Sequence, residues 1–364
     1  MSTTVVGKPK ALTAEEFAER MLGSVLGFME VFGVYLGDRL GWYAALRAQG
    51  PMTSTELAAA TGTHERYARE WLEQQAVSGI LLAEGADAWG RRFTLPEAVA
   101  EVLTDESSLA FMAPAGRMLV AACANPSALL DAYRTGGGVS WEQLGLAAGE
   151  AQAAMNRPWF EQRLPAALQG TPHLDRALSG RGARVAEVGF GGGWASISIA
   201  RTYPGLRVDG FEVDAASVEM ATRNAEAAGV TDRVSFHLVG GAEIGEQAAY
   251  DAVFAFECVH DMPHPVEVLA AMRRAARPGA PVVVMDEAVK ETFTAPGDEL
   301  ERMMYGFSLA VCLPDGMSSP GSSGTGTVMR PSVLEGYARR AGYDHLDVLP
   351  IEDFGFFRFY QLHQ

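Results

Sequence analysis

The chain has 364 residues, of which 48% are hydrophobic, and it carries a formal net charge of -16. This length favours two domains, and the apolar content is ample for a packed core. The negative charge argues against nonspecific binding to nucleic acid or to anionic membranes, because both need a cationic surface. The three cysteines, Cys123, Cys258 and Cys312, are too few and too scattered to predict a disulfide framework or a zinc site.

The amino terminus and the cysteine usage indicate a cytoplasmic protein. The segment MSTTVVGKPKALTAEEF lacks the apolar core of a signal peptide, so we expect no export. We identify no apolar run as long as the ~18 residues that a membrane span requires. Few cysteines suit a reducing compartment. We therefore expect an acidic intracellular protein without a membrane partner.

The first hundred residues predict a winged-helix module. Residues 14–48 predict one long helix whose apolar face is broad enough to be buried between two partners, so we interpret it as a subunit interface and expect a homodimer. Residues 53–62 and 64–80 predict two further helices. The runs ILLAEG and RRFTLP then predict two short strands around a turn. Helix, helix, helix and hairpin is the winged-helix order.

A winged helix raises the question of DNA binding, which the charges disfavour. The predicted third helix carries Arg66 and Arg69 but also three glutamates. A helix that enters the major groove needs a net positive charge, whereas the charges of this helix sum to a negative value. We therefore interpret residues 1–104 as a dimerisation domain that binds no nucleic acid. A regulator that binds a small ligand and DNA remains the less favoured alternative.

The rest of the chain predicts helices followed by a doubly wound sheet. Residues 105–180 predict a helical linker with substrate-pocket helices. Over residues 181–364, the apolar runs RVAEVG, LRVDGFE, RVSFHLV, YDAVFAF and APVVVMDE alternate with helix-like segments, which is typical of parallel strands in an α/β fold. HLDVLPI and FGFFRFYQL are separated by a few residues, which predicts an antiparallel pair at the sheet edge. The expected fold is a seven-stranded Rossmann-like sheet whose last strand is antiparallel.

A glycine-rich turn follows the first of these strands, in RVAEVGFGGGWASISIA. Gly189, Gly191 and Gly193 lie where a Rossmann-like sheet binds nucleotides, although this GxGxG spacing is weak evidence alone. Glu212 ends the next strand, about 20 residues further on, where a carboxylate can accept both ribose hydroxyls. Glu187, just before the turn, would repel a pyrophosphate.

The two acids favour a cofactor that carries positive charge and no phosphate. S-adenosylmethionine offers an ammonium, a sulfonium and a ribose, so Glu187 and Glu212 on either side of a glycine turn match its charges. The alternative is a structural glycine turn with two solvated or capping acids. The charge pattern therefore predicts S-adenosylmethionine as the cofactor.

On these residues, the segment from about 180 to 364 resembles a class I S-adenosylmethionine-dependent methyltransferase. The whole chain resembles the O-methyltransferase type that has an amino-terminal winged-helix dimerisation domain. The runs DEAVKETFTAPGDELERMMYGFSLAVCLP and GTGTVMRPSVLEGYARRAGY resemble an actinobacterial-looking subgroup found among natural-product tailoring enzymes. The resemblance implies that the cofactor contacts Glu187 and the three glycines of the turn, and that Glu212 binds the ribose.

The resemblance also implies where the adenine lies. Val213 would pack against it. After the third strand the family often has Asp-Ala or Asp-Val, whereas this chain has Gly241 followed by Ala242. The adenine contact would then come from the backbone there or from Glu243.

The segment AFECVHDMPHPVEVL follows the fourth strand and supplies the expected catalytic residues. Glu257 and Cys258 would line the cofactor side of the pocket. A hydroxyl acceptor is protonated at pH 7, so a histidine within hydrogen-bond reach suits the role of base. In plant-type O-methyltransferases a histidine in an HDW context is the base, and His260 falls on that position. Asp286 and Glu287 close the fifth strand, and one of them, preferably Asp286, would orient His260. The alternative is a capping or core histidine.

We therefore predict a homodimeric methyltransferase that transfers a methyl group to a small aromatic or polyketide-like acceptor, most favourably to oxygen, without a metal. Met304, Phe307 and Cys312 are candidates for the floor of an apolar acceptor pocket. Residues 314–327 predict a mobile lid or a loose connector. The same fold could instead catalyse a dehydration, decarboxylation or cyclisation with His260 as acid or base, and the sequence separates these reactions poorly.

Overall fold

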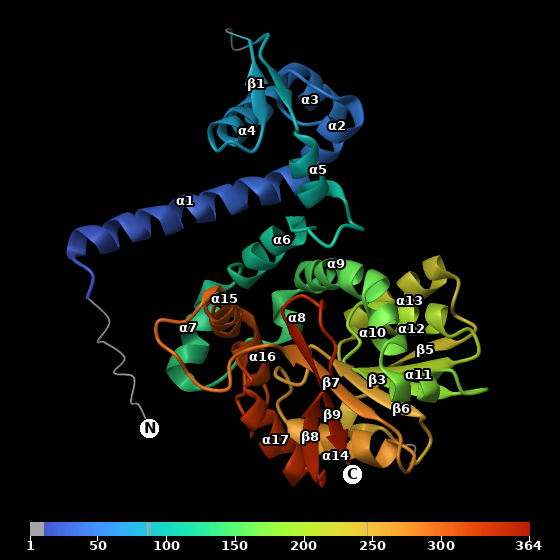
Figure 1. The fold of residues 1–364 in the computed structure, drawn as a ribbon. Coiled ribbons are helices and arrows are strands. Elements are labelled where there is room, and N and C mark those ends of the chain that lie inside the picture. The colour runs from blue at the N-terminus through green and yellow to red at the C-terminus, as the bar shows by residue number, and fades with distance from the viewer. Residues whose placement is uncertain (1–10, 86, 88, 246) are drawn as a thin grey trace, which may run out of the picture. The chain divides into compact units, whose positions relative to one another are not determined.

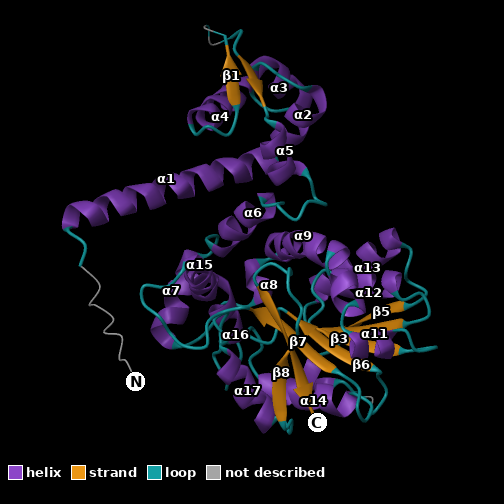
Figure 2. Ribbon diagram, in the orientation of Figure 1, coloured by secondary structure: helices purple, strands orange, loops and turns teal. Residues whose placement is uncertain are grey.

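The computed structural model describes residues 11–85, 87, 89–245 and 247–364 (Figure 1). These residues form two compact units, which divide between Asp105 and Glu106. The first unit has a winged-helix order, and the second unit is built around a mixed sheet (Figure 2).

The first unit has five helices and one hairpin in its described part. Its strands β1 and β2 pair antiparallel, with Ala83 opposite Phe93. The prediction of one helix over residues 14–48 is wrong, because the chain turns at Gly41, which has a φ of +70°. The elements are α1 (Ala14–Arg39), α2 (Trp42–Gln49), α3 (Ser54–Thr61), α4 (Glu65–Val77), β1 (Leu82–Glu84), β2 (Arg92–Thr94) and α5 (Glu97–Thr104).

Helix α1 contacts α4 through two glycines and leaves most of its apolar side chains exposed. Gly33 and Gly37 are its buried residues, and the indole nitrogen of Trp71 donates a hydrogen bond to the Gly33 carbonyl over 2.8 Å. By length and composition α1 could also cross a membrane, because an 18-residue window of this helix has a mean hydropathy of 1.3, whereas the sequence predicted no membrane span. One such helix near the amino terminus is weak evidence, because buried core helices of water-soluble proteins and signal sequences meet the same criterion.

The second unit begins with helices that pack on the sheet and on one another. The predicted helical segment before the sheet contains α6 (Ala113–Ala122), α7 (Pro126–Thr135), α8 (Trp141–Leu144), α9 (Leu146–Gln162), α10 (Leu164–Gln169) and α11 (Pro172–Leu178). Helix α9 packs against α6 and against α12 (Trp194–Thr202), so it joins the helical layer to the sheet domain.

The sheet confirms the predicted architecture. Its order is β5-β4-β3-β6-β7-β9-β8, in which β9 runs antiparallel between β7 and β8 and the other pairs are parallel. The seven apolar runs of the sequence fall on its strands. The strands are β3 (Arg184–Val188), β4 (Arg207–Glu212), β5 (Val234–Leu238), β6 (Ala252–Phe256), β7 (Val282–Glu287), β8 (His345–Val348) and β9 (Phe357–His363).

Each face of the sheet buries its own apolar core, because successive strand residues point to opposite faces. Val185 and Val283 belong to the core formed with α10–α12. Ala186 and Val284 belong to the core formed with α14 (Pro265–Ala275) and α17 (Pro331–Arg340). The remaining elements are α12 (Trp194–Thr202), α13 (Ala215–Ala228), η1 (Gly241–Glu243), α14 (Pro265–Ala275), α15 (Glu299–Phe307), the π-helical turn η2 (Ser308–Cys312), α16 (Leu313–Gly316) and α17 (Pro331–Arg340).

Residues 314–327 pack against the segment after β6. The amide of Ser323 donates to the carbonyl of Pro263 over 2.8 Å, and the amide of Gly326 donates to the carbonyl of His260 over 3.1 Å. Thr327 is buried. In this structure the segment therefore covers the His260 loop and is not a loose connector, whereas its role as a mobile lid stays a prediction.

Candidate active site

The glycine turn joins β3 to α12, and the structure requires glycine there for two reasons. Gly189, Gly191 and Gly193 have φ values of +70°, +50° and +74°, a region that residues with a side chain rarely adopt. A Cβ at Gly189 would lie 2.7 Å from Cys258 Sγ, and one at Gly193 would lie 2.6 Å from Phe236. The turn therefore exposes backbone at the carboxyl edge of the sheet, where Rossmann-like folds bind ligands.

Glu187 lies beneath this turn as a buried carboxyl group. Ser196, in the first turns of α12, donates a hydrogen bond to its Oε2. Burial raises the pKa of Glu187 to about 8, although the Ser196 hydrogen bond opposes the shift. A buried acid with this pKa ionises readily when a cation is placed beside it.

Glu212 reaches from the end of β4 back to the glycine turn. Its Oε2 accepts the amide of Gly191 over 3.2 Å, and its Oε1 accepts the amide of Val213 over 2.8 Å. Burial raises the pKa of Glu212, and these amide hydrogen bonds oppose the shift. The carboxylate thus lies where the strand edge, the turn and the next helix meet.

The residues predicted to flank an adenine follow the ends of the neighbouring strands β4 and β5. Val213 is 74% exposed, and a Cβ added to Gly240 would lie 3.6 Å from its side chain. Gly241 begins η1 and is buried, because a side chain there would meet Val188 at 2.5 Å. Ala242 and Glu243 are exposed on η1. An aspartate at position 241 would therefore clash with Val188, which explains why this position has glycine.

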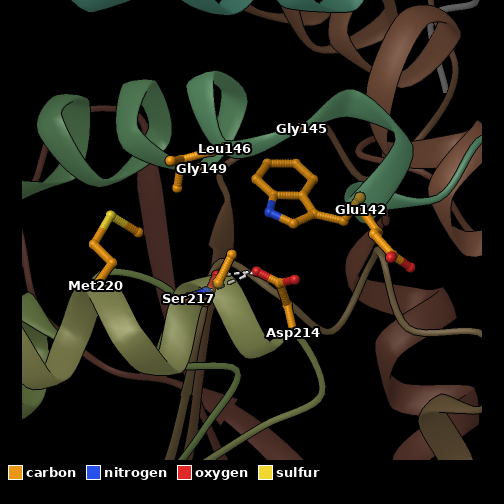
Figure 3. A pocket seen from close by; sticks show the side chains of 9 residues that line it. Glu142, Gly145, Leu146, Gly149, Asp214, Ser217 and Met220 are labelled. Atoms are coloured by element: carbon orange, nitrogen blue, oxygen red, sulfur yellow. Dashed lines mark hydrogen bonds between the residues drawn. The ribbon is translucent and has the colours of Figure 1, made fainter.

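A cavity of about 60 Å³ lies between the start of α9 and the start of α13 (Figure 3). Its lining residue Asp214 follows Glu212 by two positions in the chain. Asp214 caps α13 by accepting the amide and the hydroxyl of Ser217, over 2.8 and 2.7 Å. The sequence did not single out this lining, because α9 and α13 are distant in the chain. The lining residues are Trp141, Glu142, Gly145, Leu146, Gly149, Asp214, Ala216, Ser217 and Met220.

Glu257 follows β6 in an unusual backbone conformation. Its φ is +52°, which is rare for a residue with a side chain and recurs at functional sites. Its Oε1 accepts a hydrogen bond from Gln152 over 3.1 Å, and its Oε2 accepts one from Asn156 over 2.5 Å. Burial and the charge of Glu287 raise its pKa. Glu257 therefore ties α9 to the carboxyl end of the sheet.

Cys258 packs directly onto the glycine turn. Its Sγ donates to the carbonyl of Val188 over 3.2 Å, and it lies against Gly189. Burial raises the pKa of the Cys258 thiol well above its usual range, so it remains a protonated thiol. This contact links the turn to the loop that carries His260.

His260 is buried in the loop after β6, with carboxylates at both ring nitrogens. Its Nδ1 lies 3.0 Å from Asp286 Oδ1, in a hydrogen bond, and 3.2 Å from Glu287 Oε2. Its Nε2 lies 3.1 Å from Asp261 Oδ1. Asp286 and Glu287 end the neighbouring strand β7, so the parallel strands bring all these groups to one edge.

These contacts decide the charge of the imidazole. Burial by itself would lower the pKa of His260, but Asp261, Asp286 and Glu287 outweigh it and hold the pKa well above its usual 6.5. These neighbours therefore favour the charged imidazolium form of His260. The buried Cys312 of η2 lies beside the same ring, with donor atoms of His260, Asp261 and Cys312 within 4.8 Å of one another. Met304 is buried and Phe307 is half-buried on α15.

The sequence-predicted residues thus form two groups that meet at Cys258. One group is the glycine turn with its two acids, and the other is the loop with His260 and Asp286. The sequence did not predict the roles of Gln152, Asn156 and Asp261. Gln152 and Asn156 are four residues apart on one face of α9, a spacing that could have marked them as a pair.

Comparison with known proteins identifies two domain families in the chain. Residues 185–279 match the family described as Methyltransferase domain, and residues 30–105 match the family described as Rv2258c-like winged HTH domain. The chain is 33% identical over 124 residues to 27-O-demethylrifamycin SV methyltransferase of Amycolatopsis mediterranei, which covers 32% of this chain and 45% of that protein. The chain spans less than half the length of this and the next two curated relatives.

Solved structures match over almost the whole chain. The mitomycin 7-O-methyltransferase MmcR has a TM-score of 0.71 at 21% identity, covering 96% of this chain and 99% of that chain. Human N-acetylserotonin methyltransferase in complex with S-adenosylmethionine has a TM-score of 0.67 at 18% identity, covering 97% and 99%. At these identities the likeness establishes the fold.

Proposed function

We propose that this chain, which joins a winged helix-turn-helix domain to an S-adenosylmethionine-dependent methyltransferase domain, methylates an oxygen atom of a small molecule with His260 as the general base. The acceptor belongs to the aromatic or polyketide-like natural products. The similar proteins named for 27-O-demethylrifamycin SV and for mitomycin support an acceptor of this class.

The observation that carries the proposal is the pair of acids at the glycine turn. Glu187 lies under the turn, and Glu212 hydrogen-bonds the amide of Gly191 from the next strand. Glu212 would bind the ribose hydroxyls and Glu187 the cationic amino-acid end. Gly189, Gly193 and the backbone at Gly241 would complete the contact. When bound, S-adenosylmethionine supplies the electrophilic methyl group.

Four further residues complete the proposed cofactor side. Val213 and Ala242 are exposed near Gly240 and would pack against the adenine. Glu257 and Cys258 line the cleft beside the turn, and Glu257 adds a third carboxyl group near the cation. No metal takes part in the proposed reaction.

His260 would accept the proton of the acceptor hydroxyl. Asp286 holds Nδ1, which leaves Nε2 as the nitrogen that faces the acceptor. Asp261, which is partly exposed, occupies that nitrogen in the present structure. The acceptor hydroxyl would replace Asp261 there, and the sulfonium charge beside the ring would favour the neutral imidazole that a base requires.

The protein would work as a homodimer in the cytoplasm. The exposed apolar side chains of α1 support a second copy of this chain as the partner. The three cysteines, Cys123, Cys258 and Cys312, are free thiols in the described part of the chain, which suits a reducing compartment.

The test is methyl transfer to defined acceptors. We would incubate the protein with S-adenosylmethionine labelled in its methyl group and with phenolic and polyketide hydroxyl compounds, each beside its deoxy analogue. We expect label on the hydroxyl compounds and none on the deoxy analogues. Conversion of an acceptor without gain of the label would instead identify a dehydration, decarboxylation or cyclisation.

A further inference from the structure

Two imidazoles and one carboxylate gather on one face of the β8–β9 pair, away from the glycine turn. His345 is the direct cross-strand partner of His363. Asp347 is two residues further along β8, so its side chain leaves the same face of the sheet as His345. The two rings stack with centroids 4.4 Å apart and planes 4° from parallel. The register of β8 and β9 therefore brings the side chains of His345, Asp347 and His363 together.

The donor atoms of this cluster lie close together. His363 Nε2 is 3.1 Å from Asp347 Oδ2, and His345 Nε2 is 3.9 Å from the same oxygen. All three donor atoms lie within 4.8 Å of one another. A tetrahedral ion with bonds of about 2.0–2.2 Å holds its ligand atoms roughly 3.3 Å apart. The observed separations are therefore within a small side-chain movement of a shared ion.

One donor atom of the cluster is enclosed without a hydrogen bond. His363 Nε2 is shielded from solvent, yet none of the described residues forms a hydrogen bond with it. Asp347 lies at ion-pair distance but does not satisfy the geometry of a hydrogen bond. A buried polar atom without a partner is costly, and a bound cation would remove that cost.

We propose that His345, Asp347 and His363 bind one divalent transition-metal ion, for which Zn²⁺ is the best chemical match. Two imidazole nitrogens and one carboxylate oxygen are ligands that Zn²⁺ prefers, and water would take the fourth tetrahedral position. Mg²⁺ and Ca²⁺ prefer oxygen ligands alone. The site is structural in kind, because nothing in the proposed reaction uses it.

Binding requires the two rings to turn. His345 Nε2 is 3.9 Å from Asp347 Oδ2, further than the roughly 3.3 Å between ligands of a tetrahedral ion, so the rings must move toward the carboxylate before both can reach one ion. The side chain of His345 is half-exposed and that of His363 is partly exposed, so the rings have room to rotate. The ion would then join β8, which is the edge strand, to β9.

The test is zinc titration of the untagged full-length protein after treatment with a chelator and desalting. Calorimetry should show about one Zn²⁺ per chain, and zinc should raise the midpoint of thermal unfolding. In His345→Ala and in His363→Ala we expect at least a tenfold weaker affinity and no zinc-dependent rise in the midpoint. Mg²⁺ should neither bind nor compete.

Two matched variants separate this site from other histidines and from loss of fold. His237 is an exposed strand histidine that lies 3.7 Å from Asp209, so His237→Ala should retain full zinc binding. Asp347→Asn preserves the shape of the third ligand and should also weaken binding, while its unfolding midpoint without zinc stays that of the wild type. The inference is overturned if zinc does not saturate, or if it binds the His345→Ala/His363→Ala protein as it binds the wild type.

Discussion

His260 is held between carboxylates at both ring nitrogens. Replacing it in His260→Gln removes the proton acceptor but retains a polar side chain. We expect turnover to fall by about a hundredfold or more, because a positioned base contributes on that scale. Binding of S-adenosylmethionine, measured by calorimetry, should stay unchanged, since His260 lies outside the glycine turn. Wild-type turnover in this variant would remove the base role.

The pH dependence of the reaction distinguishes a base from a structural histidine. A base must be neutral, and the neighbouring carboxylates raise the pKa of His260 well above 6.5. The imidazolium therefore predominates below that raised pKa, and kcat/KM of the wild type should increase with pH through the region above 6.5. Asp286→Asn removes one of the raising charges and should move this rise to lower pH. A rise centred at or below 6.5 would contradict the proposed environment.

Glu212 is the proposed contact of the ribose. Glu212→Gln keeps the size of the side chain but removes the charged acceptor, so we expect S-adenosylmethionine to bind about 1–3 kcal/mol more weakly. Glu226→Gln is the matched control, because Glu226 is an exposed acid on α13 that is not among the proposed cofactor contacts. Calorimetry of both variants measures the effect. Equal affinity in Glu212→Gln and in the wild type would contradict the ribose assignment.

The raised pKa of Glu187 leads us to expect that cofactor binding releases protons. Its pKa is raised to about 8 by burial, so it is largely protonated at pH 7 in the cofactor-free protein. A bound cation favours the carboxylate, so affinity should increase as the pH rises toward 8, and the binding heat should depend on the ionisation enthalpy of the buffer. Equal heats in buffers of different ionisation enthalpy would contradict this coupling.

The raised pKa of Glu187 also determines how the stability of the cofactor-free protein changes with pH. The native pKa of Glu187 lies above the ordinary value of 4.5, so the native state binds more protons than the unfolded state between pH 4.5 and about 8. This group therefore contributes stability that is present at low pH and is lost as the pH rises through that window. Glu187→Gln should flatten this part of the stability curve.

How much of the site was predictable differs from residue to residue. Glu212 could be predicted because its position at the end of the second sheet strand follows from strand order alone. The contact between Asp261 and His260 Nε2 could not, because it depends on how one loop folds back on itself. The cluster of His345 and His363 needs the register of two strands, which apolar patterning does not provide.

At the scale of elements, apolar runs predicted the strands well because buried parallel strands are apolar along their whole length. Helix boundaries were harder. The break at Gly41 follows from a single residue with positive φ, and the apolar pattern continues across it. The packed state of residues 314–327 also depends on hydrogen bonds to distant residues, which a glycine- and serine-rich composition does not reveal.

The contact between α1 and α4 gives a prediction about stability. A Cβ at Gly37 would overlap the ring of Trp71 and lie 2.6 Å from Tyr43, whereas one at Gly27 would meet nothing within 4 Å. Gly37→Ala should therefore destabilise the first unit by about 1–3 kcal/mol. Gly27→Ala, in the same helix, should be neutral or should stabilise by up to about 1 kcal/mol. Thermal unfolding of both variants measures the difference, and equal midpoints would contradict the close packing.

At the scale of the whole molecule, the exposed side of α1 needs an explanation. Leu22 and Phe28 are 60% and 56% exposed, and large exposed apolar patches mark interaction sites. A second copy of the chain and a membrane surface would both cover such a helix. The negative charge of -16 disfavours an anionic membrane, which leaves the second copy as the favoured partner.

Charged substitutions on α1 test this choice. Because Leu22 and Phe28 are exposed in the single chain, Leu22→Glu/Phe28→Glu should preserve the fold and break only an interface. Sedimentation analysis should give the mass of two chains for the wild type and of one chain, 38.9 kDa, for this variant. Val77→Glu, at a position that is 90% exposed on α4, should remain dimeric. A wild-type protein that is monomeric in solution and sediments with uncharged lipid vesicles would instead assign α1 to a membrane surface.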